Sequence, residues 1–126
     1  MNVVDSSAWL EYFASGPNAD VFAPAVEAVD DLLVPTICLY EVCTRVLQQR
    51  GEGDALQAAA LMQQGRVVEL TAEVALDAAH TSVALGLPMA DSVILATARA
   101  HQATLWTQDA DFEGVEGVRY VAARPR

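Results

Sequence analysis

The 126-residue chain contains no lysine: its seven basic residues are all arginine, against 17 aspartates and glutamates, and the net charge is -10. Walker-type phosphate loops, response-regulator receivers, haloacid-dehalogenase-type phosphatases and pyridoxal enzymes each rely on a lysine at the site, so the composition argues against these classes. The acidity also argues against a nonspecific nucleic-acid coat, because such binding depends on Lys and Arg that neutralise phosphates. If phosphate binds here, a metal ion must help.

Cysteines are few and long apolar runs are absent, although 53% of the residues are hydrophobic, which is ample for a core. Cys38 and Cys43 share one predicted helix at a spacing that neither staples a loop nor forms a zinc knuckle, so we predict reduced core residues. No stretch reaches the roughly 18 residues of a membrane span, and Asp5 comes too early for a secretory signal. We expect one soluble, cytoplasmic domain over residues 1–126, with a tail at 122–126.

Short apolar segments alternate with helical segments along the chain. Strands are predicted at residues 2–5, 32–34, 66–70, 104–107 and 118–121, and helices at 7–13, 18–29, 37–50, 55–63, 72–86 and 90–101. The predicted strands lack the alternation of a half-exposed sheet, which indicates a parallel sheet covered on both faces. The fold class is therefore α/β.

Four acidic residues lie in apolar surroundings. Asp5 ends VVD, Glu41 lies in ICLYEVC, Asp91 lies in MADSVILA, and Asp109 follows TLWT. Removing an unpaired carboxylate from water costs several kcal/mol, so these four positions point to a shared partner. Asp5 and Asp109 fall just past predicted strands, at the edge where doubly wound sheets bind ligands. Asp91 opens one helix and Glu41 lies on another, so both can project into the same crevice.

A divalent cation is the natural partner for such a group. Clustered carboxylates repel one another, which raises the pKa of at least one of them unless a cation keeps them ionised. Oxygen ligands without nearby histidine or thiolate favour Mg²⁺ or Mn²⁺ over zinc. A divalent ion lowers the pKa of a water and orients a phosphodiester for in-line attack. That chemistry is typical of a nuclease.

The segments VVDSSAWLEYF, LYEV, MADSVILATA and LWTQDADF resemble, in order and spacing, the four motifs of PIN-domain ribonucleases. The resemblance covers most of the chain and is strongest to the VapC toxins of VapBC toxin-antitoxin modules. It implies a Rossmann-like, three-layer α/β/α sandwich with a central parallel sheet of four to five strands in the order 3-2-1-4-5. It also implies Mg²⁺-dependent endoribonuclease activity, in which Mn²⁺ can substitute, and a homodimer. The implied partner is a VapB-like antitoxin that inserts a basic or Arg-bearing segment into the active-site groove.

The resemblance also assigns roles to individual residues. Metal binding and catalysis fall to four carboxylates: Asp5, Glu41, Asp91 and Asp109. Ser7 and Thr107 match small polar residues whose hydroxyls orient ligands or water. Asp111 matches a position that is often acidic in the family, although Asp in a turn-like QDAD segment is more typical of a structural role.

Simpler interpretations stand beside these assignments. Asp5 can cap the following helix, and Asp91 can be a favourable charge in the first turn of its helix. Glu41 can form an i,i+4 pair with Arg45. Arg45 and Arg99 lie on the helices of Glu41 and Asp91 and suit phosphate contacts, but each can equally pair with a local carboxylate.

Three arginines near the C-terminus, Arg119, Arg124 and Arg126, are better explained by a solvated tail than by RNA contact. The aromatic residues Trp9, Tyr12 and Phe13 share one predicted helix, a spacing typical of core, with a dimer or antitoxin interface as the alternative.

His80 and His101 have no acidic or thiol partner at a ligand spacing, so no role is predicted for them. Taken together, the sequence favours a toxin that cleaves RNA phosphodiester bonds with metal-activated water. The alternatives are a PIN-type nuclease in RNA processing without a toxin role, and a noncatalytic PIN-like module whose carboxylate pocket receives an arginine from a partner.

Overall fold

The computed structural model describes residues 1–125, and Arg126 lies outside the described residues. The described part forms one five-stranded sheet: β1 (Asn2–Val4), β2 (Leu32–Pro35), β3 (Arg66–Val68), β4 (Thr104–Thr107) and β5 (Val118–Tyr120). The strand order is β3-β2-β1-β4-β5, and every neighbouring pair is parallel. The α/β class and the predicted strand order are therefore confirmed.

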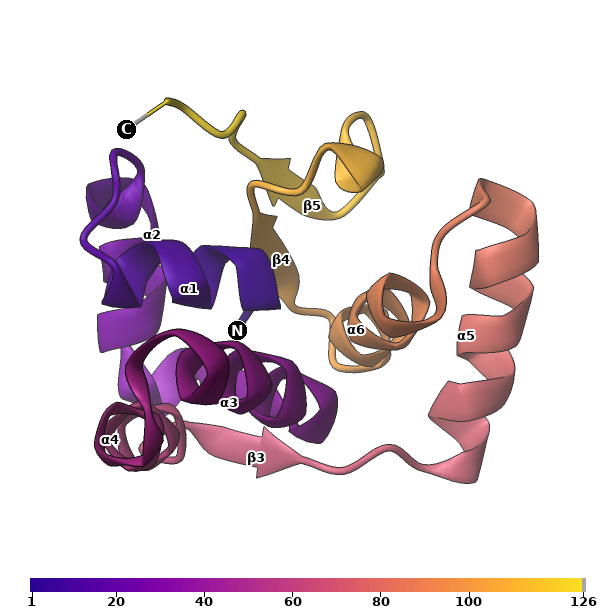
Figure 1. Ribbon diagram of the computed structural model, residues 1–126. Coiled ribbons are helices and arrows are strands. Elements are labelled where there is room, and N and C mark those ends of the chain that lie inside the picture. Colours follow the sequence, from indigo (N-terminus) through magenta and orange to yellow (C-terminus); the bar gives the residue numbers. More distant parts are fainter. Residues whose placement is uncertain (126) are drawn as a thin grey trace.

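Helices connect the strands and cover the sheet. The α-helices of the described residues are α1 (Ser6–Phe13), α2 (Ala19–Glu27), α3 (Thr36–Arg50), α4 (Glu52–Met62), α5 (Ala72–Leu85) and α6 (Met89–Ala100). The chain runs from β1 to β3 in one direction and then returns to β4 and β5 on the other side. Crossovers between parallel strands are right-handed. The helices that connect β1, β2 and β3 therefore lie on the opposite face of the sheet from the helices that connect β3 and β4. Figure 1 shows α5 and α6 on the side away from α1 and α4, while the start of α3 reaches them and packs Ile37 against their side chains.

Helix ends follow local signals in some places and differ from the prediction in others. The Thr71 side chain caps α5, because its hydroxyl oxygen accepts from the Val74 amide at 3.2 Å. Ser6 does not cap α1: it is the first helical residue, and its hydroxyl donates to another helix. Only Gly51 separates α3 from α4, with a φ of 91° that favours glycine, whereas Gly53 lies inside α4.

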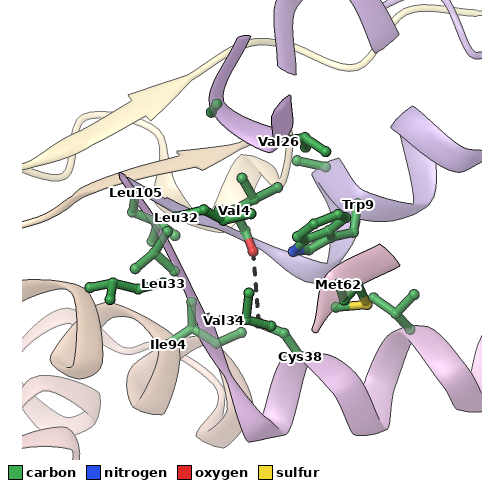
Figure 2. Close-up of a cluster of buried hydrophobic side chains, with 14 of the residues drawn as sticks. Val4, Trp9, Val26, Leu32, Leu33, Val34, Cys38, Met62, Ile94 and Leu105 are labelled. Carbon is green, nitrogen blue, oxygen red and sulfur yellow. Dashed lines mark hydrogen bonds between the residues drawn. The ribbon is translucent and has the colours of Figure 1, made fainter. Parts of the chain in front are cut away.

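The core lies along the central strands. Figure 2 shows the valine and leucine side chains of β1, β2 and β4 among Trp9 from α1, Cys38 from α3 and Ile94 from α6. Trp9 is completely buried, which confirms its predicted core role. Cys38 is a free, buried thiol that contacts the Val4 carbonyl oxygen at 3.8 Å, and burial raises its pKa, so it is an inert core residue. Cys43 is also a free thiol, half-buried on α3.

The sheet order defines one edge at which a ligand is expected to bind. β1 and β4 are neighbours, but the connections that follow β1 and β4 lead to opposite sides of the sheet. Such a topological switch point is where open α/β sheets bind ligands, beyond the carboxyl ends of the strands. The ladder continues one residue past β1, because the Asp5 amide donates to the Trp106 carbonyl at 2.9 Å. Asp5 is thereby fixed beside the end of β4.

No single helix within residues 1–125 has both the length and the apolarity to cross a membrane. Helices α5 and α6 are long and apolar enough only when taken together, and the two helices are bent by 117° at the break between them.

Candidate metal centre

Asp5 is a buried carboxylate held between two hydroxyls. Only 2% of Asp5 is exposed, and its Oδ2 accepts from Ser7 Oγ and from Thr107 Oγ1, each at 2.8 Å. The two hydroxyl oxygens lie 3.2 Å apart. Burial raises the pKa of Asp5 above its ordinary value, the two hydroxyl bonds oppose that rise, and the nearby charge of Asp109 adds to it. The side chains of Ser7 and Thr107 therefore orient Asp5.

The loop after β4 places two more carboxylates. The Asp109 amide donates to Thr107 Oγ1 at 3.0 Å, so one hydroxyl links Asp5 to this loop. The Asp109 carboxylate in turn accepts from the Asp111 amide at 2.9 Å and caps the short helix η2 (Ala110–Phe112). This turn brings Asp109 and Asp111 to the same side of the loop.

Asp91 completes a group of three acidic residues. It is half-buried in the first turn of α6, and one oxygen each from Asp91, Asp109 and Asp111 lie within 4.8 Å of one another. Burial, and after it the charges of Asp5, Asp109, Asp111 and Glu41 in that order, together raise the pKa of Asp91 to about 7. The fold thus brings Asp111, for which the turn predicted a structural role, into the acidic group.

Glu41 reaches this region from α3 but lies outside the three-residue group. Its Oε1 accepts from Ser6 Oγ at 2.7 Å, and its charge acts on Asp91. In the described residues no ion pair or hydrogen bond joins Glu41 to Arg45, so the alternative of a simple helical pair is not realised. The hydroxyl of Ser6 positions Glu41 instead.

The two helix arginines lie away from the acidic group. Arg99 donates from Nη2 to the Glu116 carbonyl at 3.1 Å. It follows Asp91 by eight residues, roughly 12 Å along the helix axis. Arg45 is exposed and lines a groove of about 460 Å³ between α1, α3 and α4, together with apolar residues that include Phe13 and Leu61. Neither arginine contacts the site carboxylates in the described structure.

Arg119 and Arg124 contact other parts of the protein, which differs from the solvated tail predicted for them. The Arg119 guanidinium lies 4.4 Å from the centre of the Trp106 ring. Arg124 donates from Nε to Asn18 Oδ1 at 2.8 Å and from Nη2 to the Pro17 carbonyl. The segment is therefore attached up to Arg124, and Figure 1 shows this end of the chain beside the start of α2. The prediction for Arg126 lies outside the described residues.

Two polar residues that sequence reasoning missed support the same loop. Asn18 is completely buried, and its side chain contacts Gln108, which lies between Thr107 and Asp109. The local sequence marks Asn18 only as the first residue of a predicted helix after Gly16 and Pro17. His101 Nδ1 lies 3.0 Å from the Thr97 carbonyl oxygen, and His80 is exposed on α5.

The donor set fits a hard divalent cation. The acidic group offers carboxylate oxygens alone, the ligand type that Mg²⁺ and Mn²⁺ prefer. Burial and then the neighbouring negative charges raise the pKa of Asp91, and a cation would offset the repulsion among these carboxylates. Asp91, Asp109 and Asp111 are the residues best placed to hold it, with Asp5 and Glu41 beside them.

Comparison with known proteins agrees with this arrangement. The family model of the PIN domain matches residues 3–118. No curated protein matches the chain.

Solved structures give the same fold over nearly the whole chain. A toxin-antitoxin complex from Klebsiella pneumoniae has a TM-score of 0.80 at 21% identity, covering 94% of this chain and 96% of that chain. VapC20 from Mycobacterium tuberculosis, described as a sarcin-ricin loop cleaving toxin, has a TM-score of 0.76 at 22% identity, with coverage of 99% and 100%. VapBC2 from Rickettsia felis, bound to promoter DNA, has a TM-score of 0.74 at 12% identity, with coverage of 96% and 97%. At these identities the similarity establishes the fold.

Proposed function

The chain belongs to the PIN-domain family, and from this membership and the acidic site we propose that it is a divalent-metal-dependent endoribonuclease, the toxin of a toxin-antitoxin pair. The observation that carries the proposal is the convergence of Asp91, Asp109 and Asp111 within 4.8 Å at the carboxyl edge of the sheet. Asp5 and Glu41 lie close enough for their charges to raise the pKa of Asp91. We propose that residues 1–126 act as a single domain in the cytoplasm.

We assign metal binding and catalysis to Asp5, Glu41, Asp91 and Asp109, and we add Asp111 to the ligand set. When bound, Mg²⁺ or Mn²⁺ supplies Lewis acidity, which acidifies a water and neutralises charge on the phosphate. The hydroxyls of Ser7 and Thr107, and that of Ser6 on Glu41, keep the carboxylates pointed at the crevice.

RNA is the proposed substrate, and its recognition must be local. The protein as a whole carries a charge of -10 and repels a polyanion, so affinity depends on cation-held phosphate rather than on a basic surface. Small domains of this kind read RNA through shape and unstacked bases. The similar VapC20 is described as cleaving the sarcin-ricin loop, which supports an RNA target without identifying the one cleaved here.

A VapB-like antitoxin is the proposed partner. Solved structures with this fold include toxin-antitoxin assemblies from Klebsiella pneumoniae and Rickettsia felis. A partner with an Arg-bearing segment would neutralise the acidic group, because guanidinium pairs with carboxylates in two parallel hydrogen bonds. The groove between α1, α3 and α4, with half-buried Phe13 on its wall, would accept an apolar segment of the same partner. This proposal gives Phe13 the interface role left open by the sequence.

We also propose a homodimer that uses the outer face of α5. Leu76, Val83 and Met89 are 68%, 88% and 77% exposed, an unusual amount of apolar surface on adjacent elements. A second copy that packs on this face would remove it from water. Light scattering of the purified protein should give twice the mass of one chain, and a single-chain mass would contradict the proposal.

The test of the main proposal is cleavage of RNA by the purified protein. We expect cleavage in millimolar Mg²⁺ or Mn²⁺ and none in EDTA. Asp5→Asn and Asp91→Asn should each lose activity by on the order of 100-fold or more, because each removes a carboxylate from the reacting site. Asp20→Asn is the matched control, since Asp20 is an exposed acid on α2, outside the proposed dimer face, and its replacement should leave cleavage unchanged.

Three outcomes separate the alternatives. Equal cleavage by wild type and both site variants would contradict the assignment and indicate a contaminating nuclease. Folded wild-type protein that binds Mn²⁺ but cleaves no RNA would favour the noncatalytic module. Cleavage without growth arrest on induction in cells would favour an RNA-processing enzyme over a toxin.

A further inference from the structure

Asn18 is a completely buried polar residue with a fully used side-chain amide. Its Nδ2 donates to Gln108 Oε1 at 3.1 Å and to the Ala122 carbonyl at 3.0 Å. Its Oδ1 accepts from Arg124 Nε at 2.8 Å, and its backbone amide donates to Glu11 Oε2 at 2.8 Å. A buried amide left without partners is costly, so this side chain holds its neighbours firmly.

These bonds join three segments that are far apart in the sequence. Asn18 lies between α1 and α2, Gln108 follows β4, and the last contacts come from the C-terminal segment. Gln108 is the residue between Thr107 and Asp109, and its backbone amide donates to Ser7 Oγ at 3.4 Å. The side chain of Gln108 therefore ties the acidic loop to Asn18, while its backbone ties the loop to the hydroxyls around Asp5.

The acidic loop needs such a restraint. Asp109 and Asp111 lie within 4.8 Å of Asp91, so three negative charges repel one another while no cation is present. Hydrogen bonds inside the loop join Asp109 to Asp111 but do not fix the loop to the rest of the protein. Contacts with other elements resist the repulsion: Phe112 is completely buried in the core, and Gln108 adds a hydrogen bond through Asn18.

We propose that Asn18 is a positioning residue of the metal centre. Its hydrogen bonds to Gln108 and to the C-terminal segment hold Asp109 and Asp111 in place before a cation binds. The role in metal binding rests on the proposed function, whereas the restraint on the loop does not. Preorganised ligands bind metal more tightly, because the cation need not order the loop itself.

A purely structural Asn18 would make a different prediction, and Asn2 provides the matched control. Asn2 Oδ1 accepts from Trp106 Nε1 at 2.9 Å, a side-chain bond that links β1 to β4 across a comparable length of chain. That bond touches none of the carboxylates. Asn2→Ala should therefore lower stability without changing the acidic loop, whereas Asn18→Ala should change both.

The experiment compares Asn18→Ala, Gln108→Ala, the double variant and Asn2→Ala. Gln108→Ala removes the loop contact and leaves the other bonds of Asn18 in place, which guards against a folding defect in Asn18→Ala. Amide hydrogen exchange over residues 108–112 is measured in EDTA, Mn²⁺ affinity by calorimetry, and melting temperature for each variant.

We expect Asn18→Ala and Gln108→Ala to speed exchange of the Asp109 and Asp111 amides and to weaken Mn²⁺ binding by about 10-fold or more. The double variant should be little worse than the poorer single variant, because both remove one shared contact. Asn2→Ala should match wild type in exchange and in Mn²⁺ affinity, even with a lower melting temperature.

Exchange over residues 108–112 that stays at the wild-type rate in Asn18→Ala and Gln108→Ala overturns the inference, even if the wild type cleaves RNA. If the variants show the expected pattern of exchange and Mn²⁺ affinity but the wild type cleaves no RNA, the positioning role of Asn18 is supported and only the proposed activity is overturned.

Discussion

Asp5 and Asp91 lie at the same edge of the sheet, but they differ in burial and in the hydrogen bonds that their carboxylates receive. Asp5 is almost fully buried and receives two hydroxyl hydrogen bonds from Ser7 and Thr107. Asp91 is half-buried beside Asp109 and Asp111, and no hydrogen bond to its carboxylate is found within residues 1–125. The raised pKa of Asp91, about 7, reflects burial and then the neighbouring acids.

The difference separates two tasks within one site. The orientation of Asp5 is set by bonds that form when the protein folds, so it needs no ligand. The group around Asp91 is assembled by loop and helix geometry, but its charges are not compensated there. Only an external cation completes this second group. Substitutions and melting curves with and without metal can test this difference between the two carboxylates.

Thr107→Val should have the largest effect, because one hydroxyl donates to Asp5 and accepts from the Asp109 amide. We expect a loss of about 1–3 kcal/mol in the free energy of unfolding, since buried polar groups lose a partner. Cleavage should fall by roughly 10- to 100-fold, as for other outer-shell changes. Urea denaturation and initial rates measure the two effects.

Thr104→Val is the control for that substitution. Thr104 is an exposed residue of the same strand, so its replacement should leave the stability and the cleavage rate close to wild type. Equal effects of the two substitutions would mean that the Thr107 hydroxyl has no special role at Asp5.

The stability of the protein should depend on pH in opposite ways with and without metal. The folded-state pKa of Asp91, about 7, lies above the ordinary value of 3.8, so folding favours the protonated form. In EDTA its contribution to stability is present below about pH 4 and is lost as the pH rises through about 7. Mn²⁺ competes with that proton, so the Mn²⁺-induced rise in melting temperature should grow from about pH 6 to about pH 8.

Asp91→Asn removes this titration and should flatten the pH dependence of the Mn²⁺ effect near neutrality. Melting curves at several pH values, with Mn²⁺ or EDTA, provide the measurement. A Mn²⁺ effect in wild type that does not change over this range would show that Asp91 is already ionised in the free protein.

The smallest expected effect is on the melting temperature in EDTA, which should change in opposite directions when Asp91 and Asp5 are replaced. Asp91→Asn removes repulsion and should raise the melting temperature by a few degrees at about pH 8. Asp5→Ala should lower it, because the hydroxyls of Ser7 and Thr107 lose their acceptor. Differential scanning calorimetry without metal decides this. A decrease for both variants would mean that Asp91, like Asp5, is stabilised by the fold.

Local signals predicted most of the elements. Apolar runs located all five strands of the described residues, and the Thr71 cap and Gly86, with a φ of 67° after α5, mark the ends of that helix. The helix boundaries moved where a single residue decides them: Gly51 alone separates α3 from α4, so α4 begins at Glu52 rather than at residue 55. Such a choice depends on backbone conformation, which composition does not specify.

The α/β class and the candidate residues Asp5, Glu41, Asp91 and Asp109 are visible in the sequence, because a carboxylate within an apolar run can be recognised without any contact information. Tertiary structure alone decided that Asp111 joins the acidic group, that Ser6 rather than Arg45 contacts Glu41, and that Asn18 holds Gln108 and Arg124. These contacts join residues up to 106 positions apart. Strand order and loop geometry bring them together, and neither is written in the local pattern of polar and apolar residues.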